Sequence, residues 1–122
     1  MTKIMIIDNS KDICSIYTDT LKCAGYDVDC INDEELALKK VLEKQPDLVV
    51  LDVLMPKIDG LHLLDILQRD TRTKNIKIVM LTNVSDSAIM QKAMKSGAKD
   101  YMVKSEVSIS EFLQRVDKAL SK

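Results

Sequence analysis

The chain has 122 residues, of which 46% are hydrophobic and 30% are charged, and its formal net charge is −1. Such a chain is long enough for one globular domain with a real core, too short for two ordinary domains, and too apolar to be intrinsically disordered. The small net charge and the scattered basic residues argue against nucleic-acid binding by this chain alone, and no apolar run approaches the ~20 residues that span a bilayer.

Five short apolar runs predict β-strands, and longer stretches with helical spacing separate them. The runs near 47–52 and 76–82 hardly alternate between apolar and polar residues, which is typical of central strands buried on both faces. The run near 26–30 does alternate, so we expect it at an edge of the sheet. In chain order the expected strands lie near 3–8, 26–30, 47–52, 76–82 and 99–104.

Capping residues mark the start or the end of five helices between and after these strands. Asn32, followed three residues later by Glu35, fits a capping box for the second helix. Five βα units with short connections predict an α/β fold, in which a doubly wound parallel sheet carries helices on both faces and residues 1–122 form one domain. The other expected caps are Asn9 or Ser10, Asp59, Ser85 or Asp86, and Ser108, with Gly25 and Gly97 as stop residues.

The cysteines and the N-terminus favour a cytoplasmic protein. Cys14, Cys23 and Cys30 are odd in number and lack a C-x-x-C spacing, which favours neither a disulfide framework nor a zinc site. We therefore expect three reduced, mostly buried thiols. The chain enters a strand directly, without the basic stretch, apolar segment and cleavage site of a secretory leader, so we expect it in the cytoplasm.

Four of the expected strands end at a polar residue that can handle phosphate or metal: Asp8, Asp52, Thr82 and Lys104. In an open parallel sheet these positions share one edge, beyond the carboxyl ends of the strands, where ligands bind. The neighbouring carboxylates of Asp8 and Asp52 would repel each other unless a cation such as Mg²⁺ lies between them. The cation would also neutralise an incoming phosphoryl group, so that a carboxylate can attack phosphorus, while Lys104 supplies a positive charge and Thr82 a hydrogen bond.

Short motifs surround these residues along essentially the whole chain. They are Asp8-Asn9, Leu51-Asp52-Val53-Leu54-Met55-Pro56 with Asp59-Gly60, Leu81-Thr82-Asn83, Gly97-Ala98 and Tyr101-Met102-Val103-Lys104. In this order and spacing they resemble the response-regulator receiver domain, and in particular its chemotaxis-regulator-like members. The resemblance implies a flavodoxin-like fold with five strands in the order 2-1-3-4-5 and five helices.

The resemblance also implies a phosphoacceptor and a metal site. Asp52 would accept a phosphoryl group from a sensor histidine kinase or a phosphotransfer protein. Asp8 and Asn9 occupy the acidic-pair positions, which hold Mg²⁺ together with Asp52, and the Leu54 backbone carbonyl would be a further ligand. The chain would be a signalling protein of a two-component system, not an enzyme, although it would assist its own phosphorylation and dephosphorylation.

Three further residues receive roles from the same resemblance. Lys104 would grip the phosphoryl group, so that Asp52, Lys104 and Thr82 together form the catalytic set. Thr82 would swing toward the phosphoryl group and Tyr101 would turn inward in response. This movement would remodel the surface formed by the fourth helix, the fifth strand and the fifth helix, and so regulate a partner protein of unknown identity.

Two residues depart from the family pattern at the site itself. Asn9 stands where the family carries Asp or Glu, which removes one negative charge and is expected to weaken Mg²⁺ binding without abolishing it. Ser105 stands where the family carries a proline with a cis bond, and a cis bond to another residue costs about 3–4 kcal/mol. We therefore expect a trans Lys104–Ser105 bond, with the loop re-routed to keep Lys104 at the site.

The positions that flank the site are also unusual. Leu54 and Val84 are apolar, and Asn83 replaces the usual small residue after Thr82. Because neither apolar side chain can orient a water molecule, hydrolysis of the acyl phosphate should be slow.

Several alternatives stay open from the sequence alone. The first reading is a stand-alone receiver, monomeric or weakly dimeric, that acts through a switched protein contact or relays its phosphoryl group. The leading rival is a receiver-like interaction module that Asn9 and Ser105 have made insensitive to phosphorylation. A small aspartate-nucleophile phosphatase would need a D-x-D pair after the first strand, and a flavin carrier would need a hydroxyl- and glycine-rich loop there; residues 8–10 provide neither.

Overall fold

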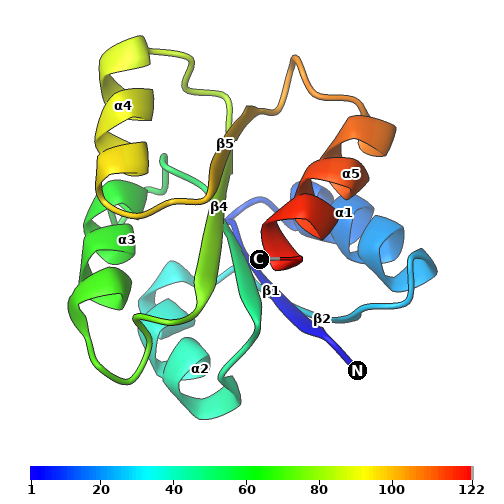
Figure 1. Cartoon of the computed structure of the whole chain (residues 1–122), viewed down its shortest axis with the longest axis horizontal. Coiled ribbons are helices and arrows are strands. Elements are labelled where there is room, and N and C mark those ends of the chain that lie inside the picture. Colours follow the sequence, from blue (N-terminus) through cyan, green and yellow to red (C-terminus); the bar gives the residue numbers. More distant parts are fainter. Residues whose placement is uncertain (122) are drawn as a thin grey trace.

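A parallel sheet of five strands lies between two layers of helices in the computed structural model, which describes residues 1–121 (Figure 1). The strand order is β2-β1-β3-β4-β5, and every pairing is parallel. Both the predicted fold and its strand order are therefore confirmed. The strands are β1 (Lys3–Ile7), β2 (Asp27–Ile31), β3 (Leu48–Leu51), β4 (Lys77–Thr82) and β5 (Asp100–Val103).

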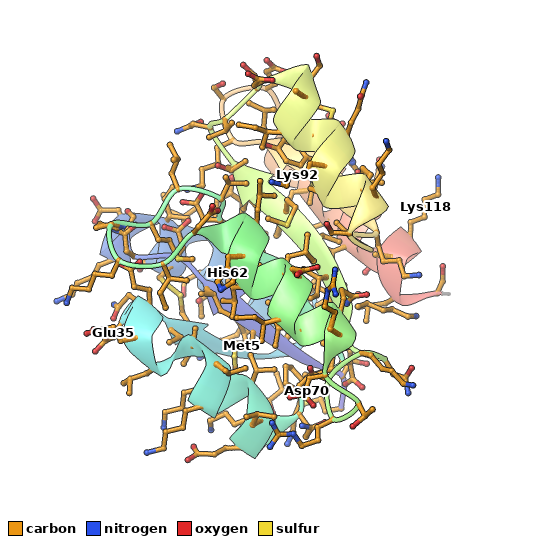
Figure 2. The ribbon with its side chains drawn as sticks, turned by 90° about the vertical axis from the view of Figure 1, so that its left-hand side faces the viewer. Met5, Glu35, His62, Asp70, Lys92 and Lys118 are labelled. Atoms are coloured by element: carbon orange, nitrogen blue, oxygen red, sulfur yellow. A yellow bond between two sulfur atoms is a disulfide. The ribbon has the colours of Figure 1, made fainter. Side chains whose placement is uncertain are left out.

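The helices divide between the two faces of the sheet. The α1 and α5 helices cover one face, while α2, α3 and α4 cover the other, which is the layer nearest the viewer in Figure 2. Within residues 1–121 no helix is both long and apolar enough to cross a membrane. The helical elements are α1 (Lys11–Cys23), the 3₁₀ turn η1 (Glu34–Leu36), α2 (Ala37–Lys44), α3 (Gly60–Arg69), α4 (Ser87–Lys95) and α5 (Ile109–Leu120).

Alternation along the strands builds a core on each side of the sheet. Ile4 and Ile6 of β1 pack with Phe112 of α5 on one face, whereas Met5 and Ile7 contribute to the core on the opposite face. All four residues of β3 are buried, as predicted for a central strand covered on both sides. The alternating strand β2 lies at an edge, also as predicted.

Most helices begin at the residues that the sequence indicates. Ser10, Asp59, Asp86 and Ser108 are the N-caps of α1, α3, α4 and α5, and each side chain accepts a backbone N–H of the first turn. The expected Asn32–Glu35 capping box is wrong. Asp33 caps the short η1 turn instead, because the chain first makes a 3₁₀ turn and α2 begins only at Ala37.

The expectation of three reduced, mostly buried cysteines is also wrong. Cys14 of α1 and Cys30 of β2 form a disulfide with their Cα atoms 5.7 Å apart, and Cys23 is exposed and free. A Cα separation near 5.5–6 Å is the usual one for disulfides. Only the packing of α1 against the edge strand β2 creates this proximity, and a separation of 16 residues carries no recognisable sequence signal.

Reduction of this disulfide is expected to lower the free energy of unfolding by about 2–3 kcal/mol, because a cross-link over a loop of this length restricts the unfolded chain. Urea unfolding with and without dithiothreitol measures the difference, in a Cys23→Ser background that prevents exchange with the free thiol. A variant that also carries Cys14→Ser and Cys30→Ser should show no effect of reductant. Equal midpoints for the reduced and oxidised protein would contradict the prediction.

Candidate functional site

The polar residues predicted at strand ends lie together at the carboxyl edge of the sheet. Ile7 of β1 pairs with Leu51 of β3, so the residues that follow them, Asp8 and Asp52, are neighbours across two central strands. On the other side, the Lys104 N–H donates to the carbonyl of Thr82 at 2.8 Å, which places the end of β5 beside the end of β4. Parallel register alone therefore assembles the site from four separate segments.

Lys104 joins the two aspartates. Its ammonium Nζ lies 2.7 Å from Asp8 Oδ2 and 3.2 Å from Asp52 Oδ2. The side chains are largely shielded, with exposed fractions of 11% for Lys104, 3% for Asp8 and 8% for Asp52. The convergence of these three side chains on one point, on which the functional interpretation depends, is thus present in the structure.

The environment of Lys104 favours its charged form. Burial by itself lowers the pKa of a lysine, but the hydrogen bond to Asp8 and the negative charge of Asp52 outweigh it, and the pKa of Lys104 is raised above its ordinary value. The ammonium is therefore positive at neutral pH and offsets the charge of the two carboxylates. Any anion that enters the site meets this fixed positive charge.

The second oxygen of each aspartate is held by the turn that follows its strand. Ser10 N–H donates to Asp8 Oδ1 at 3.0 Å, and Leu54 N–H donates to Asp52 Oδ1 at 3.2 Å. Such local bonds fix the orientation of an Asp side chain at a strand end. The Oδ2 atoms are left to face the ammonium, so the carboxylates present one ordered pair of oxygens to the site.

The donor set of this edge suits a hard divalent cation. Within residues 1–121 no group of three or more His, Cys, Asp or Glu side chains is arranged for a metal. The two carboxylates of Asp8 and Asp52 lie together, however, and the residues that follow them in sequence, Asn9 and Leu54, offer an amide oxygen and a carbonyl oxygen. Mg²⁺ prefers oxygen ligands and retains several waters, so two carboxylates are enough for it.

Thr82 and Tyr101 are linked through the backbone of Val84. Thr82 is fully buried, and its Oγ1 accepts the Val84 N–H at 3.4 Å. The Tyr101 hydroxyl donates to the Val84 carbonyl at 2.6 Å, and burial, helped by the charges of Asp52 and Asp86, raises the pKa of that hydroxyl. The ring is already buried, with 6% exposed, so the expected inward turn of Tyr101 stays a prediction that this conformation does not test.

The loop after Lys104 follows the predicted path. The Lys104–Ser105 peptide bond is trans, as are the other peptide bonds of residues 1–121. The N–H groups of Glu106 and Val107 both donate to the carbonyl of Val103, and this tight turn carries the chain away while Lys104 remains at the site. A proline is thus not needed to direct the lysine toward the aspartates.

Sequence reasoning missed one residue beside the site. Glu34 of η1 is buried, with 5% exposed, and its Oε2 accepts the N–H groups of Lys57 and Ile58 in the loop after β3. The only signal in the sequence is a run of acidic residues at the expected start of a helix, which is usually a solvated first turn. The fold, not the local pattern, turns this carboxylate inward.

Comparison by sequence connects the chain with two-component regulators. The model of the response regulator receiver domain family matches residues 4–117. The DNA-binding dual master transcriptional regulator RpaA of Synechocystis sp. is 36% identical over 95% of this chain and 48% of its own length. The alkaline phosphatase synthesis transcriptional regulatory protein PhoP of Bacillus subtilis is 36% identical over 84% of this chain and 42% of its own length. The chain thus spans about half the length of the curated relatives it matches.

Solved structures agree with this comparison over the whole chain. A two-component response regulator from Clostridium difficile superposes with a TM-score of 0.91 at 27% identity, and the match covers 100% of this chain and 98% of the other. The chemotaxis protein CheY4 of Vibrio cholerae gives a TM-score of 0.89 at 27% identity, with 98% of each chain covered.

Proposed function

This chain belongs to the response regulator receiver domain family, and we propose that it serves as a phosphoacceptor switch in a two-component system. The observation that carries the proposal is the ammonium of Lys104 between the Oδ2 atoms of Asp8 and Asp52. An isolated aspartate at a strand end would be an ordinary cap or loop acid. Two shielded carboxylates that share a lysine form a site for an anion and a cation together.

Asp52 is the proposed phosphoacceptor. One of its carboxylate oxygens attacks the phosphorus of a phosphohistidine in a sensor kinase or phosphotransfer protein. The new O–P bond forms as the P–N bond breaks, the ring nitrogen keeps the electron pair of that bond, and the imidazole leaves neutral because its other nitrogen carries a proton. Lys104 offsets the charge on the phosphoryl oxygens during this transfer. Thr82, at the end of the next strand, is the proposed donor of a hydrogen bond to the phosphoryl group.

Asp8, Asp52, Asn9 and the Leu54 carbonyl would hold Mg²⁺ in this proposal. When bound, the ion neutralises charge that accumulates between the carboxylate and the phosphoryl group. Lys104 bonds to the same two carboxylates, so its ammonium offsets part of their negative charge before any metal binds.

The proposed output is a change in the surface of α4, β5 and α5. The Thr82 hydroxyl and the Tyr101 ring both bond to Val84, so a movement of Thr82 toward a phosphoryl group alters the backbone that receives the Tyr101 hydroxyl. A partner protein that binds this surface would sense the change. The relatives RpaA and PhoP are about twice as long as this chain, and both are transcriptional regulators by name. That residues 1–122 form the whole receiver unit, monomeric or weakly dimeric, is therefore part of the proposal.

The cytoplasm is the proposed location, because sensor kinases of this family of systems transfer phosphoryl groups there. Thiol reductants keep most cysteines reduced in that compartment. The Cys14–Cys30 bond would then be present only in protein exposed to an oxidant.

One experiment tests the proposed function. The protein is incubated with Mg²⁺ and a small acyl phosphate donor, and its intact mass and the release of inorganic phosphate are followed. We expect one phosphoryl group per chain, absent from Asp52→Asn and retained in Asp59→Asn, which removes the charge of a nearby carboxylate but leaves the acceptor and the α3 cap in place. No adduct would favour the interaction module that is insensitive to phosphorylation, and many turnovers of phosphate release would favour a phosphatase.

Restoring the acid at position 9 should tighten metal binding. The variant Asn9→Asp adds a negative charge beside Asp8 and is expected to lower the Mg²⁺ dissociation constant about tenfold, which corresponds to about 1.4 kcal/mol. A Mg²⁺ titration that monitors backbone amide chemical shifts measures this dissociation constant. Asn75→Asp is the matched control, since this exposed residue precedes β4 at the opposite edge of the sheet. Equal affinities in all three proteins would contradict the prediction.

The acyl phosphate is expected to persist well beyond seconds. Leu54 is 65% exposed and Val84 is half-buried beside the site, and neither can orient a water for attack on phosphorus. An amide at position 54, introduced by Leu54→Gln, should shorten the lifetime of the phosphorylated state. Intact mass after removal of the donor measures this lifetime. Ile16→Gln changes an exposed apolar residue on α1 and should leave the lifetime unchanged. Rapid loss from the wild-type protein would show that the apolar pair does not limit hydrolysis.

A further inference from the structure

Glu34 is a buried carboxylate that the proposed function does not yet use. Among residues 1–121, the buried charged side chains are Asp8 and Asp52 of the site and Glu34, which is 5% exposed. A buried charge is costly unless it is hydrogen-bonded, so the bonds that satisfy it show what it does. Those of Glu34 reach across to a segment that is more than 20 residues away in the sequence.

The partners of Glu34 are two consecutive backbone N–H groups. Its Oε2 accepts the Lys57 N–H at 2.8 Å and the Ile58 N–H at 2.7 Å. Short bonds from backbone amides to a carboxylate are charge-assisted and stronger than bonds between neutral groups. One oxygen of one side chain therefore fixes the second half of a loop that has no helix or strand of its own.

That loop begins at the proposed phosphoacceptor. It leaves β3 at Asp52, passes Leu54 and enters α3 at Gly60. Its start is held by the Leu54 N–H on Asp52 Oδ1 and its end by the Gly60 N–H on the Val53 carbonyl at 2.9 Å. Glu34 supplies a further anchor between these two ends, three and four residues after Leu54, so the segment that carries Leu54 is held on both sides.

We propose that Glu34 is a positioning residue, which sets the Leu54 carbonyl and the Asp52 carboxylate for metal binding by clamping the Lys57 and Ile58 amides. The inference rests on the proposed function of the same site. Glu34 touches neither the metal nor the phosphoryl group in this role, and acts only through the loop. Residues that orient metal ligands in this way typically contribute about 10–100-fold to affinity.

The next residue provides a matched control. Glu35 contacts the same Lys57, but through the side-chain ammonium at 3.3 Å, in an ion pair whose two side chains are both 63% exposed. Figure 2 shows Glu35 at the outer margin of the molecule, beside the start of α2. Such an exposed pair contributes little. The two neighbouring glutamates thus separate an effect on the loop backbone from a general loss of acidic charge or of contact with Lys57.

Three substitutions at position 34 distinguish geometry from charge. Glu34→Gln keeps an oxygen at the same reach, which can accept both N–H groups, and removes the charge. Glu34→Asp keeps the charge but shortens the side chain by one methylene, so that it cannot reach both amides without a shift of the loop. Glu34→Ala removes both bonds and leaves the two amides without this partner.

The test is a titration of the full chain with Mg²⁺ alone. The backbone amide chemical shifts of Asp52, Leu54, Lys57 and Ile58 report the binding. We expect the dissociation constant to rise about tenfold or more in Glu34→Ala and Glu34→Asp, and to stay within about threefold of wild type in Glu34→Gln and Glu35→Ala. Thermal unfolding is recorded for each variant. If Glu34→Ala does not fold, the comparison of the Gln and Asp variants decides.

The outcomes separate this inference from the proposed function. Suppose that the wild-type protein binds Mg²⁺ and is phosphorylated, but Glu34→Asp binds the ion as tightly as Glu34→Gln and Glu35→Ala do. The positioning role is then wrong, and the proposed function stands. If the wild-type protein neither binds Mg²⁺ nor accepts a phosphoryl group on Asp52, the proposed function itself fails. Weakened binding in the Ala and Asp variants with rescue by Gln supports the positioning role.

Discussion

Replacement of Lys104 by methionine is expected to lower the free energy of unfolding by about 4 kcal/mol in metal-free buffer. The ammonium contacts both Asp8 and Asp52, and all three side chains are largely shielded from water. Removal of one partner from a buried charge cluster leaves the others uncompensated, which typically costs about 3–5 kcal/mol. Methionine fills a similar volume, so little of the effect would come from a cavity. Urea unfolding in the presence of EDTA measures it.

Mg²⁺ should restore most of this lost stability. A ligand that binds only the folded state raises the free energy of unfolding with its concentration, and the variant offers the ion two carboxylates without a competing lysine. The double variant Asp8→Asn with Lys104→Met should also be less destabilised than Lys104→Met alone, because it removes the repulsion between the two acids. Lys99→Met, an exposed lysine just before β5 at the opposite edge of the sheet, is the control. Loss of stability that neither Mg²⁺ nor the second substitution relieves would show that packing, not charge, explains the effect.

The regular elements of the fold follow closely from the sequence because their signals are local. The largely apolar runs of β3 and β4 and the cap residues Ser10 and Asp59 act within a few residues of themselves. The structure contains all of them where expected. Strand order did not follow from these signals. It came from the family resemblance, since no local pattern states which strands are neighbours.

The meeting of Asp8, Asp52 and Lys104 was also accessible from the sequence, for a topological reason. Each follows an apolar run, and parallel strands bring all such positions to one edge whatever their separation along the chain. The roles assigned to Asn9, Thr82, Tyr101 and the other site residues remain predictions, because they depend on ions, phosphoryl groups and movements that geometry alone does not reveal.

Contacts between elements that no local sequence pattern signals could not be predicted from the sequence. The Cys14–Cys30 bond depends on how α1 packs over the edge strand β2, and an odd number of cysteines without motif spacing gave no reason to expect it. Glu34 was hidden for a similar reason, since the expected capping box directed attention to Glu35. The helix α2 starts a few residues later than expected, and Glu34 lies in the 3₁₀ turn that precedes it. The ends of helices and strands are the hardest part of a structure to predict from sequence. Here the start of α2 decides the surroundings of Glu34.

Replacement of Gly60 by alanine is expected to damage both the fold and the site, although alanine ordinarily stabilises a helix. Gly60 is the first residue of α3 and is buried against the end of β3. A Cβ atom there would collide with the carbonyl oxygen of Asp52 and would lie 2.7 Å from the Cα of Val53. Both neighbours are backbone atoms, so neither can be moved by a change of rotamer.

The collision should outweigh the gain in helix propensity. Alanine is favoured over glycine in a helix by about 1 kcal/mol, whereas overpacking costs about 1–3 kcal/mol and occasionally more. We expect a net loss of about 2 kcal/mol, the upper end of the overpacking cost less the gain in propensity, since α3 must move away from β3 or the backbone of Asp52 must shift. Such a shift acts on the proposed phosphoacceptor itself, and a misplacement of about 1 Å can lower a reaction rate about 100-fold.

Gly60→Ala thus connects folding with function, and two measurements on one variant check it. Thermal unfolding reports the strain, and the rate of phosphoryl transfer from a small donor, measured at a temperature where the variant is folded, reports the displacement of Asp52. Ser87→Ala is the matched control, because Ser87 is the exposed first residue of α4 and faces no backbone of another strand. A variant that is as stable and as readily phosphorylated as wild type would mean that β3 and α3 can separate at no cost. The close contact between Gly60 and Asp52 would then have no part in holding the acceptor in place.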